Sequence, residues 1–185
     1  VTKVNGNRLK VDNLWHSMLE RCYCDKFHVK CPTYLGCTVS KDFKVFKIFK
    51  SWCQQQIGFG CLDDKGKHFE LDKDLLIKGN KVYSEDTCCF IPREINVALI
   101  YNQTKKGNHP IGVSFNKVSN KFVAYVKKGE GSREYLGYFE DVSVAFLAYK
   151  EAKEAYLKEL ANKWKGKIDP RVYEALIGWE INIDD

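Results

Sequence analysis

The stretch from Glu70 to Asn96, ELDKDLLIKGNKVYSEDTCCFIPREIN, brings together side chains that could do chemistry. Asp72 stands where an alternating, strand-like run ends, a loop follows, and Asn96 lies in a segment that begins after Pro92. An acid, a loop and an asparagine in this order have the outline of a metal-dependent nuclease site. Lys73, however, occupies the place where such a site would need a histidine.

Lys73 decides whether this stretch predicts cleavage or only binding. The pKa of a solvated lysine lies about three units above neutral pH, so the side chain is protonated. Lys73 could act as a base only if burial or a nearby cation lowered its pKa. The neighbouring Asp72 and Asp74 oppose that shift. A protonated lysine can still hold a phosphate as a point charge, which would turn a cutting site into a binding site. The plainer interpretation, that LDKD is only the end of a surface strand, stays open.

Hydrophobic periodicity predicts the elements that position these residues. Apolar residues at helical spacing predict a helix over 11–23 and a second over 43–57, although the second also begins with a strand-like alternation. The middle of the chain predicts the order strand, loop, strand, helix: a strand ending near Asp72, a Gly79–Asn80 turn, a short extended piece, a helical turn capped by Ser84, and a further turn from Pro92 through Asn96.

The C-terminal half changes to a pattern of short extended runs. IGVSF, KFVAYVKK and REYLGYF are separated by turn-rich segments and predict an antiparallel meander. Residues 141–165 predict one long amphipathic helix, with Asp141 as its N-cap, that packs across the meander. A short helix restarts at Asp169–Pro170, and WEINIDD ends the chain as an acidic strand or tail. The predicted fold class is α+β: a helix-rich N-terminal part, then a three-stranded antiparallel sheet packed on one long helix.

Alternation along KFVAYVKK predicts which side chains the sheet exposes. Phe122, Ala124 and Val126 should face the helix, while Val123, Tyr125 and Lys127 face outward. The outward positions of the other two strands are Ser114, Asn116, Arg133 and Tyr135. This face is polar, aromatic and basic, so we expect it to meet a partner.

Charge along the chain is distributed unevenly. The total is +6, from 30 Lys and Arg against 24 Asp and Glu, but no acid occurs between Ile95 and Lys128. An acid-free segment with several lysines suits contact with phosphates, although it could also be a solvated lysine-rich loop. The lysines in it are Lys105, Lys106, Lys117, Lys121, Lys127 and Lys128.

Composition limits the remaining possibilities. The chain has 185 residues, 44% of them hydrophobic, and no apolar run reaches the roughly 18 residues of a membrane span. We therefore expect a globular cytoplasmic protein with no membrane partner.

The eight cysteines lack paired C-x-x-C spacing, which favours reduced thiols. One cluster could form a Cys3His zinc site, namely Cys24, His28, Cys31 and Cys37.

The meander and its helix resemble the apetala/ethylene-response-factor type DNA-binding domain over about residues 108–160. The matching residues are Gly112-Val113, Lys121 to Ala124, Leu136 to Phe139, Ala145, Ala148-Tyr149 and Ala152. The resemblance implies that the open sheet face enters the major groove of duplex DNA. The positions implied as DNA contacts on the strands are Ser114, Asn116, Tyr125, Lys127, Arg133 and Tyr135, with Lys117 and Lys121 on the phosphates. Several positions that are arginine in the family are Ser, Asn or Lys here, so the same base sequence need not be read.

The Glu70–Asn96 stretch resembles the HNH, or beta-beta-alpha-metal, nucleases. The resemblance implies that Asp72 and Asn96 hold a metal ion, Mg²⁺ if the site is active, that Asn80 is the loop asparagine, and that Lys73 replaces the catalytic histidine. The whole chain looks like phage-encoded endonuclease-like proteins in which these two modules are paired.

These observations predict a phage or mobile-element protein that binds double-stranded DNA in the cytoplasm of a bacterial host. The expected divisions are an HNH-like domain over 1–104, the sheet domain over 105–168, and a short helix with an acidic tail over 169–185. Two alternatives remain: an active Mg-dependent endonuclease or nickase that uses Asp72, Asn96 and Lys73, and an inhibitor that binds a host defence or transcription protein. Oligomeric state is not predicted.

Overall fold

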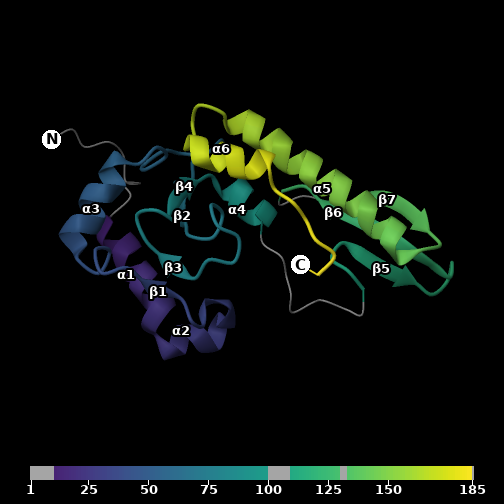
Figure 1. Ribbon diagram of the computed structural model, residues 1–185, viewed down its shortest axis with the longest axis horizontal. Helices are drawn as coiled ribbons and strands as arrows, with labels where there is room; N and C mark the ends of the chain where they lie inside the picture. The colour runs from purple at the N-terminus through teal and green to yellow at the C-terminus, as the bar shows by residue number, and fades with distance from the viewer. Residues whose placement is uncertain (1–10, 100–108, 130–132, 185) are drawn as a thin grey trace. The chain divides into compact units, whose positions relative to one another are not determined.

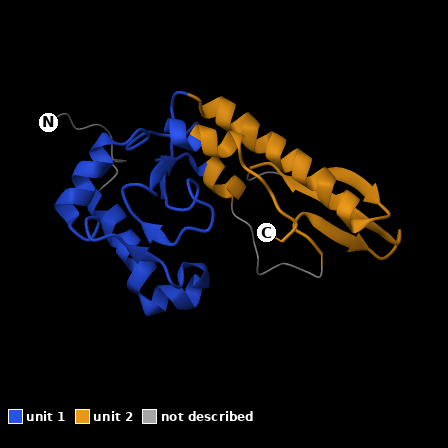
Figure 2. Ribbon diagram, viewed as in Figure 1, with its two compact units in different colours: residues 1–93, 166–172 blue, residues 94–165, 173–185 orange. Residues whose placement is uncertain are grey.

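A computed structural model describes residues 11–99, 109–129 and 133–184 (Figure 1). The chain divides into two compact units, each described by itself below (Figure 2). Unit 1 contains the chain up to Arg93 together with Gly166–Val172, and unit 2 contains Glu94–Lys165 together with Tyr173–Asp185. The expected divisions at residues 104 and 168 stay predictions.

The helices of unit 1 come early in the chain. They are α1 (Val11–Tyr23), α2 (Asp25–Lys30), the 3-10 turn η1 (Pro32–Tyr34) and α3 (Phe46–Gln55). The prediction of α1 is confirmed, whereas the second helix was predicted too long because it begins at Phe46 rather than Phe43. The residues before it form a turn, in which the Phe43 N–H donates to Ser40 Oγ and the Val45 N–H to the Asp42 carbonyl.

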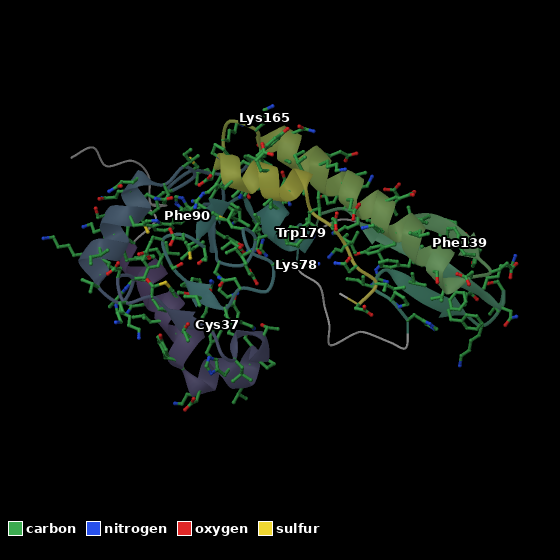
Figure 3. The ribbon with its side chains drawn as sticks, in the orientation of Figure 1. Cys37, Lys78, Phe90, Phe139, Lys165 and Trp179 are labelled. Atoms are coloured by element: carbon green, nitrogen blue, oxygen red, sulfur yellow. The ribbon has the colours of Figure 1, made fainter. Side chains whose placement is uncertain are left out.

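Aromatic packing anchors α3 in unit 1. Phe43 and Phe49 are fully buried with ring centroids 5.1 Å apart, and Trp52 lies 4.7 Å from Phe43. The same indole contacts Phe90, which is fully buried and labelled in Figure 3. The Trp15 indole N–H of α1 donates to the Phe43 carbonyl at 2.8 Å. Offset and edge-on ring pairs of this kind stabilise packing beyond the effect of the area that they bury. They therefore fix the orientation of α3 in its unit.

Two small sheets complete unit 1. Strand β1 (Thr38–Val39) pairs in parallel with β3 (Val82–Tyr83), and β2 (Glu70–Asp72) pairs antiparallel with β4 (Cys89–Ile91). The strand that ends at Asp72 is therefore confirmed, but its partner is β4, a strand that was not predicted. The reason is that all three β4 residues are buried, and a short fully apolar run has no alternation to indicate a strand.

Unit 2 is the predicted meander backed by a helix. Strands β5 (Val113–Asn116), β6 (Lys121–Lys127) and β7 (Arg133–Phe139) form one antiparallel sheet in the order β5-β6-β7. Helix α5 (Val142–Trp164) runs along the sheet (Figure 1). Asp141 caps it as predicted, accepting the Ser143 and Val144 N–H groups at 2.7 and 3.1 Å. The other helices are α4 (Arg93–Leu99) and α6 (Pro170–Ile177), each of which crosses a boundary between the units.

The core of unit 2 lies between the sheet and α5. Its buried members are Ala124 and Val126 from β6, Ala145, Phe146 and Tyr149 from α5, and Ile181 from the C-terminal segment. Phe122 packs against the same cluster, so the predicted helix-facing side of β6 is confirmed. The C-terminal segment forms neither helix nor strand; it is held by the Ile181 N–H on Glu154 and by Lys150 on the Ile181 carbonyl.

Gly112 permits the close approach of β5 to α5. It has φ +77°, and a Cβ at this position would lie 2.1 Å from Cδ2 of Tyr149. Gly129 offers a comparison in the same unit, since it has φ +67° but a Cβ there would meet only the Tyr156 hydroxyl at an ordinary 3.5 Å.

We predict that Gly112→Ala destabilises the protein much more than Gly129→Ala. Both variants carry the backbone strain of a positive φ, about 1 kcal/mol, and only Gly112→Ala adds overpacking of about 1–3 kcal/mol. Urea unfolding followed by circular dichroism measures the difference. Equal losses in the two variants would contradict the packing of β5 on Tyr149.

Candidate nucleic-acid interface and the Asp72–Lys73 turn

The outward face of the sheet is set by the register of its strands. Ser114 pairs with Val123 and Val123 with Tyr138, Tyr125 pairs with Tyr135, and Lys127 with Arg133. These partners share a face, because residues directly opposite one another in a ladder point to the same side. No Asp or Glu occurs among the outward positions of the three strands, all of which the structure describes. Val123 faces outward as predicted but is only 2% exposed, so it adds no contact surface.

Three tyrosines form a cluster on this face. The ring centroids of Tyr125 and Tyr135 are 5.7 Å apart, and those of Tyr135 and Tyr138 are 5.5 Å apart. Tyr135 and Tyr138 are each 50% exposed. The Asn116 amide donates to the Tyr138 hydroxyl at 3.3 Å, which orients that ring. The cluster offers flat apolar surface and hydroxyl groups at the same place.

Tyr138 joins the cluster because β7 contains a bulge. The register shifts between Ala124 and Tyr125, so that Leu136 is the extra residue of β7 and packs toward the core. Strict alternation from Arg133 and Tyr135 would have turned Tyr138 inward. The sequence analysis missed Tyr138 for this reason, and no pattern in the sequence marks the bulge apart from Gly137.

The cations of this region differ in their availability. Lys127 and Arg133 are exposed cross-strand neighbours at one end of the sheet, and Lys117 is exposed in the turn after β5. Lys121, by contrast, pairs with Glu140 at 2.8 Å, and Lys128 with Glu134 at 3.0 Å. Exposed ion pairs are weak and are screened by salt, so a phosphate could compete for both lysines. Lys105 and Lys106 lie outside the described residues.

Asn116 has a local structural role besides its place on this face. Its side-chain oxygen accepts the Val118 and Ser119 N–H groups at 2.9 and 3.2 Å and so closes the β5–β6 turn. Ser114 is exposed beside it. The structure thus brings together on one face the strand residues expected from the sequence as DNA contacts, with Asn116 committed in part to the turn.

Lys153 places a further positive charge beneath the sheet. It lies on α5, is 5% exposed, and its ammonium is 5.7 Å from the Tyr156 ring centroid. No carboxylate of the described chain pairs with it. Burial, and secondarily the charge of Lys127, lowers the pKa of Lys153 to about 8. The protein therefore holds an uncompensated cation close to the basic end of the sheet.

Asp72 organises the turn that follows β2. Its Oδ1 accepts the Asp74 and Leu75 N–H groups at 3.0 and 2.7 Å. Burial and the charge of Asp74 raise the pKa of Asp72 to about 6, although those backbone donors act in the opposite direction. The Asn80 amide donates to the carbonyls of Lys73 and Val82 at 2.6 and 2.7 Å, which closes the loop between β2 and β3. Asp72 and Asn80 thus shape the loop.

Lys73 is enclosed rather than presented to solvent. It is 7% exposed, its ammonium lies 3.1 Å from Asp74 Oδ2, and the rings of Tyr34 and Tyr83 lie 5.8 and 5.9 Å from it. Burial alone would lower its pKa, but the charge and hydrogen bond of Asp74 prevail, so the pKa of Lys73 is raised. A lysine in this state keeps its proton and does not supply a base.

Arg21 joins Lys73 around the same rings, which the sequence analysis missed. Its guanidinium carbon lies 5.6 Å from the centroid of Tyr34, and Tyr83 interacts with it electrostatically. Arg21 comes from α1 and Tyr83 from β3, so only the folded unit brings them together. The result is a cation and aromatic cluster that ties α1, η1, β2 and β3.

The Cys and His side chains expected to bind zinc do not come together in the described chain. Among the described residues, no group of three or more His, Cys, Asp or Glu side chains is arranged to hold an ion. The zinc set of Cys24, His28, Cys31 and Cys37 is therefore not brought together; the His28 ring instead bonds the Arg21 carbonyl at 2.9 Å, and Cys37 is buried. Asn96 lies partly buried on α4, and a metal site made by Asp72 and Asn96 stays a prediction.

Comparison with known proteins adds no family. No family model, curated protein or solved structure matches this chain. No helix in the described part of the chain combines the length and apolar character needed to span a membrane. The functional argument therefore depends on the geometry of the sheet face and of the Asp72–Lys73 turn.

We predict that Lys153 makes stability depend on pH in a defined window. Its pKa is about 8 in the folded protein against 10.5 ordinarily, so the unfolded chain binds more protons between these values and stability rises with pH across them. The full difference corresponds to about 3 kcal/mol. Lys153→Met should stabilise the protein at pH 7 and remove this rise.

Urea unfolding of wild type and Lys153→Met from pH 7 to about pH 10, the range over which the shifted lysine titrates, measures the effect. The difference between the two curves is the informative quantity, because buried thiols such as Cys53, with a pKa of about 12, oppose the trend in wild type. Lys158→Met, which alters an exposed lysine of the same helix, is the control. A difference curve that is flat with pH would contradict the burial of a charged Lys153.

Proposed function

We propose that the protein binds double-stranded DNA through the outward face of the β5-β6-β7 sheet. One observation supports this most: the exposed Lys127–Arg133 pair lies on the same acid-free face as the Tyr125, Tyr135 and Tyr138 cluster. Cations of this kind contact phosphates, and tyrosine hydroxyls, serine and asparagine can bond both backbone and base edges. The sheet would occupy the major groove, which admits a narrow β-ribbon.

The proposal includes a relation to apetala/ethylene-response-factor type domains in unit 2 and to HNH nucleases around Asp72. For the first, the sheet backed by a capped helix supports the relation. For the second, the antiparallel pair of β2 and β4, followed by α4, offers a ββα order, and Asn80 closes the loop that follows β2. We place the protein among DNA-binding proteins of phages or other mobile elements on these grounds.

Binding without cleavage is the form of this function that the Lys73 geometry favours. A general base must accept a proton from water, whereas Lys73 is buried, ion-paired with Asp74 and flanked by two rings. The altered position then contributes to the fold of unit 1 instead of to hydrolysis. Under this proposal Mg²⁺ is not required for binding to DNA.

We predict that a Tyr125→Ala, Lys127→Ala, Arg133→Ala variant loses most of its affinity for a mixed-sequence DNA duplex. Two cationic contacts to phosphate disappear, so the slope of log affinity against log salt should fall by about 1.8, at about 0.9 for each contact. Fluorescence anisotropy at several salt concentrations measures both quantities. Unchanged affinity in this variant, with the fold intact by circular dichroism, would refute the sheet-face proposal.

We also predict that wild-type protein leaves supercoiled plasmid intact in Mg²⁺ or Mn²⁺. The protonated, enclosed Lys73 provides no base for the attacking water. Agarose electrophoresis of the plasmid gives the answer, with Asp72→Ala prepared in parallel to reveal contaminating nuclease. Cutting by wild type that disappears in Asp72→Ala would contradict the binding-only function. Cutting gained by Lys73→His would show that a single substitution disarms an otherwise complete site.

A further inference from the structure

A second basic surface lies on α3, in unit 1. Phe49 and Cys53 are fully buried on one side of this helix. The opposite side consists entirely of exposed residues, none of them acidic: Lys47, Ile48, Lys50, Ser51, Gln54 and Gln55. Lys44, just before the helix, is also exposed. We call the set Lys44, Lys47 and Lys50 the α3 lysines.

The α3 lysines form no ion pair within the described chain, although Asp42 lies two residues before Lys44. From Phe43 to Leu62 the chain has no Asp or Glu. None of the three lysines forms an ion pair with a carboxylate in the described part of the chain, and Lys44 lies instead over the Tyr23 ring, 5.5 Å from its centroid. Lys121 and Lys128 of unit 2 differ in this respect, because both have glutamate partners. The α3 lysines are therefore available to an anionic partner.

The helix presents these lysines rigidly. Phe43, Phe49 and Trp52 fix α3 in the aromatic core described above, and the Trp15 hydrogen bond fixes its start. Lys47 and Lys50 are three residues apart and so lie on one face, about 4.5 Å apart along the axis. A DNA duplex carries a negative charge about every 1.7 Å along its axis, so neighbouring lysines of a helix meet several phosphates.

We propose that α3 is a second DNA-contacting element, in which the α3 lysines bind backbone phosphates of duplex DNA. Charge complementarity and side-chain chemistry both point to this partner, since Ser51, Gln54 and Gln55 between the lysines can bond phosphate oxygens or base edges. An anionic membrane fits less well, because a membrane-binding helix inserts its apolar face and that of α3 is buried in the core. This inference rests on the proposed function and adds a contact from unit 1.

The test uses the full chain with Lys44, Lys47 and Lys50 changed to Gln. The probe is a mixed-sequence DNA duplex, and affinity is measured by anisotropy over a range of salt concentrations. Each lost phosphate contact lowers the slope of log affinity against log salt by about 0.9, so the triple variant should lose about 2 to 3 units of slope. A control variant with Lys26, Lys30 and Lys158 changed to Gln removes the same charge from exposed positions elsewhere and should retain most of the slope.

The outcomes separate this inference from the proposed function. If the α3 variant has the same slope and affinity as the control variant while the Tyr125, Lys127, Arg133 variant loses binding, the α3 inference is overturned and the sheet function stands. If neither the α3 nor the sheet variant loses affinity, both proposals fail. Binding to phosphatidylserine–phosphatidylcholine vesicles that the α3 variant loses, with an unchanged DNA slope, would assign the surface to a membrane and would also overturn the inference.

Discussion

The burial of one side of the β5-β6-β7 sheet against α5 is the constraint on which the other features of unit 2 depend. Ala124 and Val126 are fully buried there together with Ala145 of the helix. Because side chains alternate along a strand, this packing leaves Tyr125 and Lys127 no orientation except outward. A one-residue slip of β6 would bury a lysine and expose the core. The chemical character of the open face is therefore a consequence of how the closed face packs.

The Asp72–Lys73 turn illustrates how a site can keep its framework while its chemistry changes. Asp72 and Asn80 supply the hydrogen bonds that shape the loop. Lys73 occupies the adjacent place with a proton that Asp74 holds. Lys73 is buried against the rings of Tyr34 and Tyr83, so this lysine has a structural role that does not depend on catalysis. In our account, Lys73 helps to hold the fold of unit 1, and unit 1 presents the α3 lysines.

Sequence periodicity predicted those parts of the fold in which a polar face alternates with an apolar one. The three strands of unit 2 and α1 were predicted because each has such a face, whereas Asp141 was predicted as an N-cap from its residue type and position. Strand β4 was missed because its residues are all buried, and α2 because six residues are too few to establish a helical period.

Site residues whose position depends on tertiary structure could not be predicted from sequence patterns. Tyr138 faces outward only because of a bulge that depends on cross-strand register. Lys73 was considered as a solvated residue, whereas Tyr34 and Tyr83, distant in sequence, enclose it. In the sequence the basic side of α3 consists only of lysines between aromatic residues. That these lysines are exposed to a partner is shown by the burial of the aromatic side in the structure.

The central claim is that the tyrosine and cation face of the sheet meets DNA, and an NMR titration tests it most directly. Isotope-labelled protein would be titrated with a short mixed-sequence duplex while backbone amide resonances are followed. Our account predicts that the largest shifts fall on Ser114, Tyr125, Lys127, Arg133, Tyr135 and Tyr138, with the buried strand positions Ala124 and Val126 less affected. Shifts confined to other surfaces would contradict it. The absence of any shift with the duplex in molar excess over the protein would contradict it as well.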